Sequence, residues 1–280
     1  MIEEIEKLPK EKLARLKENI NSLQQLTVAF SGGVDSTFLL KVAHEVLKDR
    51  LLAVTARTTT FPDREFREAE DYVKCLGVNH RVLLFDEFQV PGFSDNPSDR
   101  CYLCKKELFS QIKKLSQENG IDHVADGSNQ DDLSDYRPGM KALQKLGIIS
   151  PLKEAGMTKN EIRVLSREMG LPTWNKPAFA CLATRFPVGD KITREKLQMV
   201  DKAEEYLQGL GFLQVRVRCH SNLARIEVAK EARHKFFDAD LMDQIAEEFI
   251  KIGFTYVSMD LQGYRTGSMN KFTDKILREA

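Results

Sequence analysis

The sequence predicts an α/β fold, in which a doubly wound parallel sheet is followed by a smaller C-terminal α+β domain. Two observations support this prediction. Apolar runs typical of buried strands alternate with helical patterns over the first part of the chain, which indicates a parallel sheet covered by helices. A glycine turn, Ser31–Ser36, stands between the first of these runs and a helix, at the strand end where such sheets bind their ligands.

The elements of the first domain follow from apolar periodicity. Strands are expected over 26–30, 51–55, 80–85 and 122–126, separated by helices over 35–48, 62–76 and 102–118. A leading helix over 2–24 precedes them, and a short helix over 158–169 follows. The segment 174–187 has a proline on each side of Cys181 and is expected to be a loop.

Beyond Gly189 the pattern changes to helix, two strands, helix and strand. The expected elements cover 193–209, 213–220, 224–228, 239–251 and 255–261. This order predicts a small second domain with an antiparallel sheet. The boundary is placed near residue 188, which gives domains over 1–188 and 189–280.

Composition limits the function classes. Among 280 residues, 42 lysines and arginines balance 42 aspartates and glutamates, so the chain has no overall basic field and a nucleic-acid partner is not expected. No apolar run reaches the length of a membrane span, and the charged N-terminus lacks a signal-peptide core. The protein is therefore expected to be cytoplasmic, where its five cysteines would serve as core residues, ligands or nucleophiles rather than in disulfides.

The glycine turn has the chemistry of an anion site. Gly32 and Gly33 let the backbone approach an anion closely, and the helix start that follows adds N–H donors. Ser31 and Ser36 can donate hydroxyl hydrogen bonds, and Asp35 can hold Mg²⁺. The turn is not a Walker A loop, because the chain contains no G-x-x-x-x-G-K-[ST]. Asp126 and Gly127 end another strand and are expected at the same edge of the sheet.

Three cysteines form a candidate metal or nucleophile site. Cys101 and Cys104 open an expected helix, whose N-terminus stabilises thiolates, and Cys181 follows in the proline-flanked loop. Three thiols can hold a 4Fe–4S cluster by three corners and leave the fourth iron open. A redox pair or a zinc site completed by His123 or His220 remains an alternative. Cys75 and Cys219 are expected in the core.

Arginines near the second domain are candidate phosphate ligands. Arg216 and Arg218 share one face of an expected strand, and Arg185 follows the cysteine loop. Guanidinium groups suit phosphate recognition, but an ordinary solvated face with surface ion pairs is an equal alternative. Glu204 is expected to be a solvated helical glutamate.

With these motifs in place, the chain resembles the LarE family, the PP-loop sulfur transferases of nickel-pincer nucleotide cofactor synthesis. Its glycine turn has the SGG-x-DS form of the PP-loop of ATP pyrophosphatases. The resemblance covers nearly the whole chain and includes six further motifs: residues 126–127, 135–139, 174–176, 185–187, 215–218 and 263–270.

The resemblance implies a function and a set of site residues. Family members adenylate the carboxylates of pyridinium-3,5-biscarboxylic acid mononucleotide with ATP and convert them to thiocarboxylates. ATP and Mg²⁺ would be handled by the turn and the strand end: Ser31, Gly32, Gly33, Asp35, Ser36, Asp126 and Gly127. The substrate phosphate would be bound by Arg185, Arg216 and Arg218. The second domain would bind substrate and form a homo-oligomer, and a sulfide donor would be a partner.

The family has two sulfur sources. In one branch a single cysteine gives up its sulfur, and an aromatic residue stands where this chain has Cys101. In the other branch three cysteines hold a 4Fe–4S cluster. Cys101, Cys104 and Cys181 match the second branch, which predicts a catalytic, cluster-dependent enzyme with Asp35 and these thiols as catalytic residues.

Other readings of the same residues remain. Cys181 as a sacrificial sulfur donor is one of them, and a tRNA thiolase of the PP-loop class is another. An amide-forming PP-loop synthetase would not need the three thiols. A nucleotide-binding regulator would hold ATP and a cluster without turnover.

Overall fold

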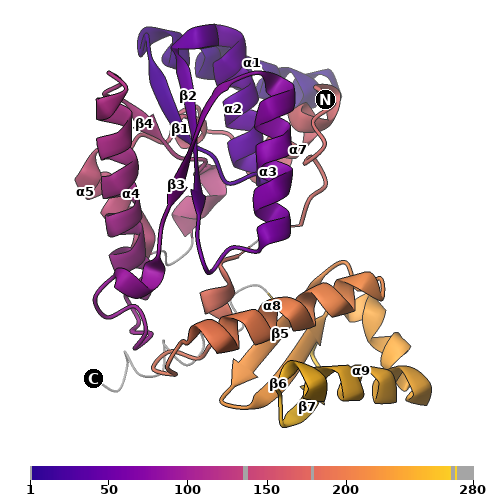
Figure 1. Cartoon of the computed structure of the whole chain (residues 1–280). Helices are drawn as coiled ribbons and strands as arrows, with labels where there is room; N and C mark the ends of the chain where they lie inside the picture. The colour runs from indigo at the N-terminus through magenta and orange to yellow at the C-terminus, as the bar shows by residue number, and fades with distance from the viewer. Residues whose placement is uncertain (1, 135–137, 178–179, 266–268, 270–280) are drawn as a thin grey trace. The chain divides into compact units, whose positions relative to one another are not determined.

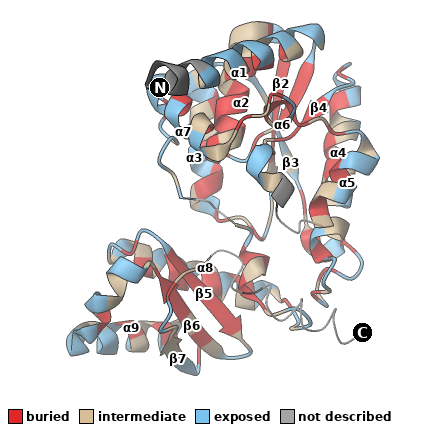
Figure 2. Ribbon diagram, turned by 180° about the vertical axis from the view of Figure 1, so that it is seen from behind, coloured by how far each residue is buried: buried red, intermediate tan, exposed pale blue. Residues whose placement is uncertain are grey.

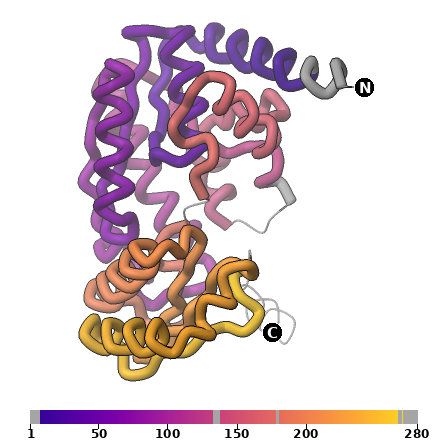
Figure 3. The backbone as a smooth tube through the Cα atoms, turned by 90° about the vertical axis from the view of Figure 1, so that its right-hand side faces the viewer, coloured from indigo at the N-terminus to yellow at the C-terminus, as the bar shows by residue number. Residues whose placement is uncertain are grey.

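The computed structural model describes residues 2–134, 138–177, 180–265 and 269. Contacts between Cα atoms divide the chain into two compact units. The first contains residues 1–90 and 101–179, and the second contains residues 91–100 and 180–280. The domains expected from the sequence, 1–188 and 189–280, stay a prediction, as do their roles. Figure 3 follows the described part of the chain, coloured from indigo near its N-terminal end to yellow near its C-terminal end.

The first unit is built on a parallel sheet of four strands in the order β3-β2-β1-β4. The strands are short: β1 (Leu26–Ala29), β2 (Leu51–Arg57), β3 (Asn79–Leu84) and β4 (Val124–Ala125). All three neighbouring pairs are parallel. The chain moves from β1 outward to β3 and then returns to the other side of β1, so the topology reverses between β1 and β4.

Helices cover both faces of this sheet (Figure 1). They are α1 (Ile2–Ser22), α2 (Val34–Leu47), α3 (Asp63–Leu76), α4 (Arg100–Glu118), α5 (Pro138–Leu146), α6 (Pro151–Glu154) and α7 (Lys159–Glu168). Alternate residues of β2 show the two faces. Leu51 and Ala53 join the core beneath α1, α2 and α3, whereas Leu52 and Val54 join a separate core with residues of α4 and α5. The predicted doubly wound parallel sheet is therefore confirmed.

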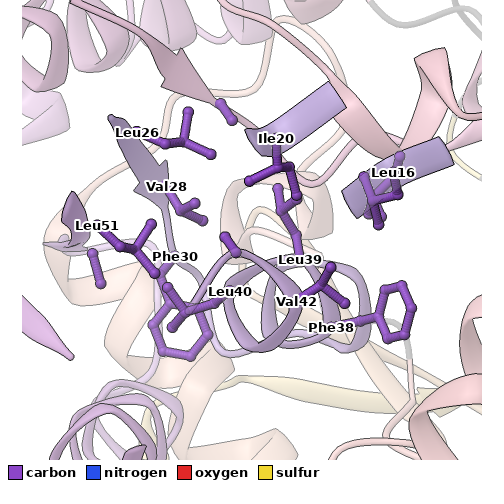
Figure 4. Packing of buried hydrophobic residues seen from close by; sticks show 14 of the residues in the cluster. Leu16, Ile20, Leu26, Val28, Phe30, Phe38, Leu39, Leu40, Val42 and Leu51 are labelled. Atoms are coloured by element: carbon purple, nitrogen blue, oxygen red, sulfur yellow. The ribbon is translucent and has the colours of Figure 1, made fainter. Parts of the chain in front are cut away.

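The larger core explains why α2 forms where it does. Phe38, Leu39 and Val42 of α2 are fully buried and pack with Val28 of β1 and Leu16 of α1 (Figure 4). Burying one such side chain contributes roughly 1.5–3 kcal/mol. This packing fixes the start of α2 against the end of β1 and so holds the glycine turn between them.

The second unit contains a sheet of three strands in the order β5-β6-β7. The strands are β5 (Val215–His220), β6 (Leu223–Val228) and β7 (Tyr256–Met259), and the helices are α8 (Arg194–Gly209) and α9 (Ala239–Ile252). The expected antiparallel sheet is wrong in part, because β6 and β7 are parallel while β5 and β6 are antiparallel. The crossover through α9 brings β7 back in the direction of β6. Figure 2 shows β5 and β6 as buried strands.

The other expected helices and strands agree closely with the observed ones, but α5 and α6 were not predicted and the expected loop over 174–187 contains a 3₁₀ helix. Short 3₁₀ helices occur at 48–50, 87–89, 130–134, 182–185 and 230–237. None of the described helices is long and apolar enough to cross a membrane. The motif residues Asp135, Tyr136 and Arg137, and Gly267 and Asn270, lie outside the described residues.

Candidate active site

The glycine turn is held in an unusual backbone conformation. Gly32 has φ +68°, a left-handed value that favours glycine. A Cβ at this position would lie 2.9 Å from Cβ of Ala69 on α3. Gly33 is extended and caps α2, without a side-chain hydrogen bond to the first turn. Close packing against α3 therefore requires glycine at position 32, and the uncapped helix start suits an anion.

Hydrogen bonds of two serines stabilise the turn. The Ser31 and Ser36 hydroxyls lie 3.0 Å apart, and Ser36 Oγ donates to the carbonyl of Gly33 at 3.2 Å. The Ser31 N–H donates to Ser36 Oγ at 3.3 Å. Both hydroxyls lie in the turn, as expected, whereas their contact with ATP stays a prediction.

The loop after β4 approaches the same helix start. A Cβ on Gly127 would lie 3.0 Å from the backbone nitrogen of Ser36, so any other residue would press against the backbone of α2. Asp126 is buried and accepts hydrogen bonds from Ser150 Oγ at 2.7 Å and from Ser128 Oγ. Asp126 thus fixes the loop that brings Gly127 to α2. The structure gathers these residues at the topological reversal, the place where open α/β sheets bind ligands.

One carboxylate oxygen of Asp35 is paired with a lysine, and the other has no hydrogen-bond partner among the described residues. Its Oδ2 lies 2.5 Å from Nζ of Lys159, the first residue of α7. Its Oδ1 is buried without a hydrogen-bond partner among the described residues. Burial raises the pKa of Asp35, although Lys159 acts in the opposite direction. A buried, unpaired carboxylate oxygen fits a hard cation such as Mg²⁺.

Two lysines near the turn were not found by the sequence analysis. Lys159 reaches Asp35, and Lys176 Nζ lies 3.5 Å from the carbonyl of Gly32. The signal for Lys159 was its position after Thr158, which forms a capping box with Glu161 and so fixes the start of α7. Lys176 was predicted only as part of the motif over residues 174–176.

Cys101 and Cys104 lie about one turn apart near the start of α4. Cys101 is exposed and Cys104 is half-buried. A spacing of three places both on one side of the helix. Cys181 is exposed and belongs to the second unit, where its carbonyl accepts from Thr184 Oγ1 at 2.8 Å. Among the residues that the structure describes, no group of three His, Cys, Asp or Glu is placed to hold a metal ion.

The other two cysteines, Cys75 and Cys219, differ in burial. Cys219 is fully buried, as expected, and burial raises the pKa of its thiol to about 11. The expectation of a core position for Cys75 is wrong, because this residue is exposed near the end of α3. Apolar neighbours at helical spacing do not fix which side of the helix a cysteine takes.

The three predicted arginines lie in a buried ionic network rather than on a solvated face. Arg185 is fully buried, and its Nε and Nη2 donate to the two carboxylate oxygens of Glu204 at 2.8 and 2.9 Å. Its Nη1 donates to Ala180 O at 3.0 Å and to Thr184 Oγ1 at 2.8 Å. Arg185 therefore braces the segment around Cys181, and its contact with a substrate phosphate stays a prediction.

Arg216 and Arg218 are also buried. Arg218 donates to Oε2 of Glu227 at 3.0 and 2.7 Å, and its Nη1 donates to Thr184 O at 3.1 Å. The Arg216 guanidinium lies 5.4 Å from the ring centroid of Tyr264. Burial, and then the charge of Arg185, lower the pKa of Arg216. A nearby anion would favour the charged form of Arg216, but binding of a substrate phosphate by these arginines stays a prediction.

Two buried glutamates, Glu204 and Glu227, complete this network. Glu204 is fully buried, so its assignment as a solvated helical glutamate is wrong. Its Oε1 also accepts the N–H of Val217 at 2.9 Å. Glu227 is fully buried between Arg218 and Arg225, the latter at 2.9 Å. A paired charge can be buried, and hydropathy does not reveal its partner.

One family model and several known proteins are similar to this chain. Residues 15–92 match the asparagine synthase family. A protein of Synechocystis sp., described as uncharacterized, is 42% identical over 94% of this chain and 98% of its own length. One component of the glutamine-hydrolyzing GMP synthase of Thermoplasma volcanium is 27% identical over 67% of this chain and 65% of its own length.

A further relative is pyridinium-3,5-bisthiocarboxylic acid mononucleotide synthase of Lactiplantibacillus plantarum. It is 39% identical over 92% of this chain and 94% of its own length. This match extends through both compact units and includes the glycine turn between β1 and α2. The chain therefore belongs to the LarE family of PP-loop enzymes.

Proposed function

We propose that the chain is an ATP-dependent sulfurtransferase that converts the carboxylates of pyridinium-3,5-biscarboxylic acid mononucleotide to thiocarboxylates. The observation that carries this proposal is the 39% identity to the bisthiocarboxylic acid mononucleotide synthase over 92% of the chain. The glycine turn supports it, because its geometry suits the phosphates of ATP.

The first chemical step is activation. A carboxylate oxygen of the substrate attacks the α-phosphorus of ATP, and the bond from that phosphorus to the α,β-bridging oxygen breaks. Pyrophosphate leaves and an acyl-adenylate remains. The N–H groups at the start of α2 and the hydroxyls of Ser31 and Ser36 would hold the phosphates, and Asp35 would hold Mg²⁺, which offsets charge on the phosphates.

The second step exchanges oxygen for sulfur. A sulfur nucleophile attacks the acyl carbon, the bond to AMP breaks, and AMP leaves with the electron pair. Cys101, which is exposed, and Cys104, which is half-buried, would hold two corners of a 4Fe–4S cluster, and Cys181 would be the third ligand. When bound, the cluster supplies the sulfur that is transferred. The chain's own contribution is to present these thiols and to brace the Cys181 segment through Arg185.

The remaining parts of the proposal concern the substrate and partners. The crowded cations of Arg216 and Arg218, with Arg185, would bind the single phosphate of the mononucleotide. A sulfide donor would reload the site after each transfer, and the second unit would take part in a homo-oligomer in the cytoplasm. Each of these assignments rests on the family resemblance.

The proposal can be tested with enzyme that is prepared under anaerobic conditions. Protein purified without oxygen should contain iron and inorganic sulfide and should release pyrophosphate only when ATP, Mg²⁺ and the mononucleotide are all present. Replacing each of the three cysteines by alanine should abolish the cluster and thiocarboxylate formation while pyrophosphate release persists. If iron is absent and Cys181 loses H₂S after one reaction, Cys181 is instead a sacrificial donor.

A further inference from the structure

The ammonium of Lys176 is surrounded by three acceptors at the edge of the glycine turn. Its Nζ lies 2.6 Å from Oε2 of Glu65, 2.7 Å from Oε2 of Glu68 and 3.5 Å from the carbonyl oxygen of Gly32. An ammonium has three N–H donors, and each has an acceptor here. Both glutamates belong to α3, so Lys176 joins that helix to the turn.

The backbone of this segment is anchored independently by α7. Arg163 donates through Nη1 to the carbonyl of Trp174 at 2.8 Å and through Nη2 to the carbonyl of Lys176 at 2.7 Å. The guanidinium of Arg167 lies 5.1 Å from the ring centroid of Trp174. The position of the ammonium is thus set by α7 on one side and by α3 on the other.

The contact lies in a region with little access to water. The side chains of Lys176 and Glu65 are 15% and 10% exposed. Burial acts to lower the pKa of Lys176, but hydrogen bonds and charges of Glu65 and Glu68 outweigh it and raise the pKa above its usual value. The ammonium therefore stays charged at neutral pH. An ion pair with little exposure holds its geometry more strictly than a surface pair does.

The carbonyl of Gly32 determines the direction of the next N–H. In a trans peptide, the C=O of one residue and the N–H of the following residue point in opposite directions. A Gly32 carbonyl held toward Lys176 and α3 therefore directs the Gly33 N–H away from them. No described peptide bond is cis.

We propose that Lys176 is a positioning residue for ATP: it holds the Gly32 carbonyl against α3 and so fixes the Gly33 N–H as a phosphate donor. Glu65 and Glu68 hold the ammonium in place. This role rests on the proposed function, in which the turn binds the phosphates of ATP. Lys176 acts through the backbone, so its loss weakens nucleotide binding and leaves the affinity for the mononucleotide unchanged.

The test compares variants by their affinity for ATP. Lys176→Met removes the contact but leaves the buried carboxylate of Glu65 uncompensated, which can unfold the protein. The double variant K176M/E65Q removes both charges and keeps the shapes of the side chains. Glu68→Gln is a mild third variant, since Glu68 is 63% exposed. Lys74→Met, at an exposed position of the same helix, is the matched control.

Calorimetry with α,β-methylene-ATP and Mg²⁺ gives the dissociation constant without turnover. We expect it to rise about tenfold in K176M/E65Q, which corresponds to about 1.4 kcal/mol, and two- to threefold in E68Q. K74M should bind as the wild type does, and the KM for the mononucleotide should not change in any variant. Equal affinities in the wild type, K176M/E65Q and E68Q would overturn this role and leave the proposed function standing. A wild-type chain that does not bind the analogue would overturn both.

Discussion

Replacing Glu204 by glutamine should destabilise the second unit strongly. Both carboxylate oxygens of Glu204 accept from Arg185, at 2.8 and 2.9 Å, and both side chains are fully buried. Glutamine turns one acceptor into a donor and removes the charge that compensates the Arg185 guanidinium. Breaking a buried pair by removing one partner costs roughly 3–5 kcal/mol, which lowers the melting temperature of a unit this size by roughly 10–30 °C.

Differential scanning calorimetry of the full chain measures this loss. Glu205→Gln is the matched control, because Glu205 is the next residue of α8 and is exposed. A double variant, R185M/E204M, should recover much of the lost stability, since well-packed apolar residues can replace a buried ion pair. It should not recover activity, because Arg185 also braces the segment around Cys181. Equal melting temperatures for E204Q and E205Q would refute this reasoning.

Three further predictions concern single residues. Asp35→Asn should slow pyrophosphate release about 100-fold or more, measured in a coupled assay, because it weakens the hold on Mg²⁺. Gly32→Ala should abolish binding of ATP in calorimetry, since its Cβ would meet α3 at 2.9 Å; Gly77→Ala, with a similar φ of +71° but open space around it, should cost about 1–2 kcal/mol and keep binding. Cys219, whose pKa is raised to about 11, should resist iodoacetamide at pH 8 while exposed Cys75 is alkylated, as mass spectrometry of the folded protein can show; equal labelling of the two would contradict the assigned burial.

The parallel sheet was predictable because β1 and β2 are buried at most of their positions, whereas β3 is largely exposed. Runs such as Leu26–Phe30 and Leu51–Thr55 are apolar at almost every position, which is typical of strands covered by helices. The glycine turn was predictable for a different reason. Its conformation is encoded by two adjacent glycines, and its place between a strand and a helix follows from the flanking patterns.

The ionic network of the second unit was not predictable in the same way. Arg185 and Glu204 are polar in any hydropathy scale, and only the fold reveals that each is the other's buried partner. The direction of β7 was missed because the pattern of a short strand does not specify whether its neighbour is parallel. Lys176 was not predicted as a site residue because its acceptors lie far away in the sequence, in the glycine turn and in α3.

The most direct test of the account counts thiocarboxylates formed per chain by anaerobic enzyme supplied with ATP, Mg²⁺, sulfide and the mononucleotide. Activation at the glycine turn, with sulfur delivered through Cys101, Cys104 and Cys181, predicts repeated turnover and an intact Cys181 in the mass spectrum of the protein. Sulfur transfer that stops after a single event per chain, with dehydroalanine at position 181, would contradict it.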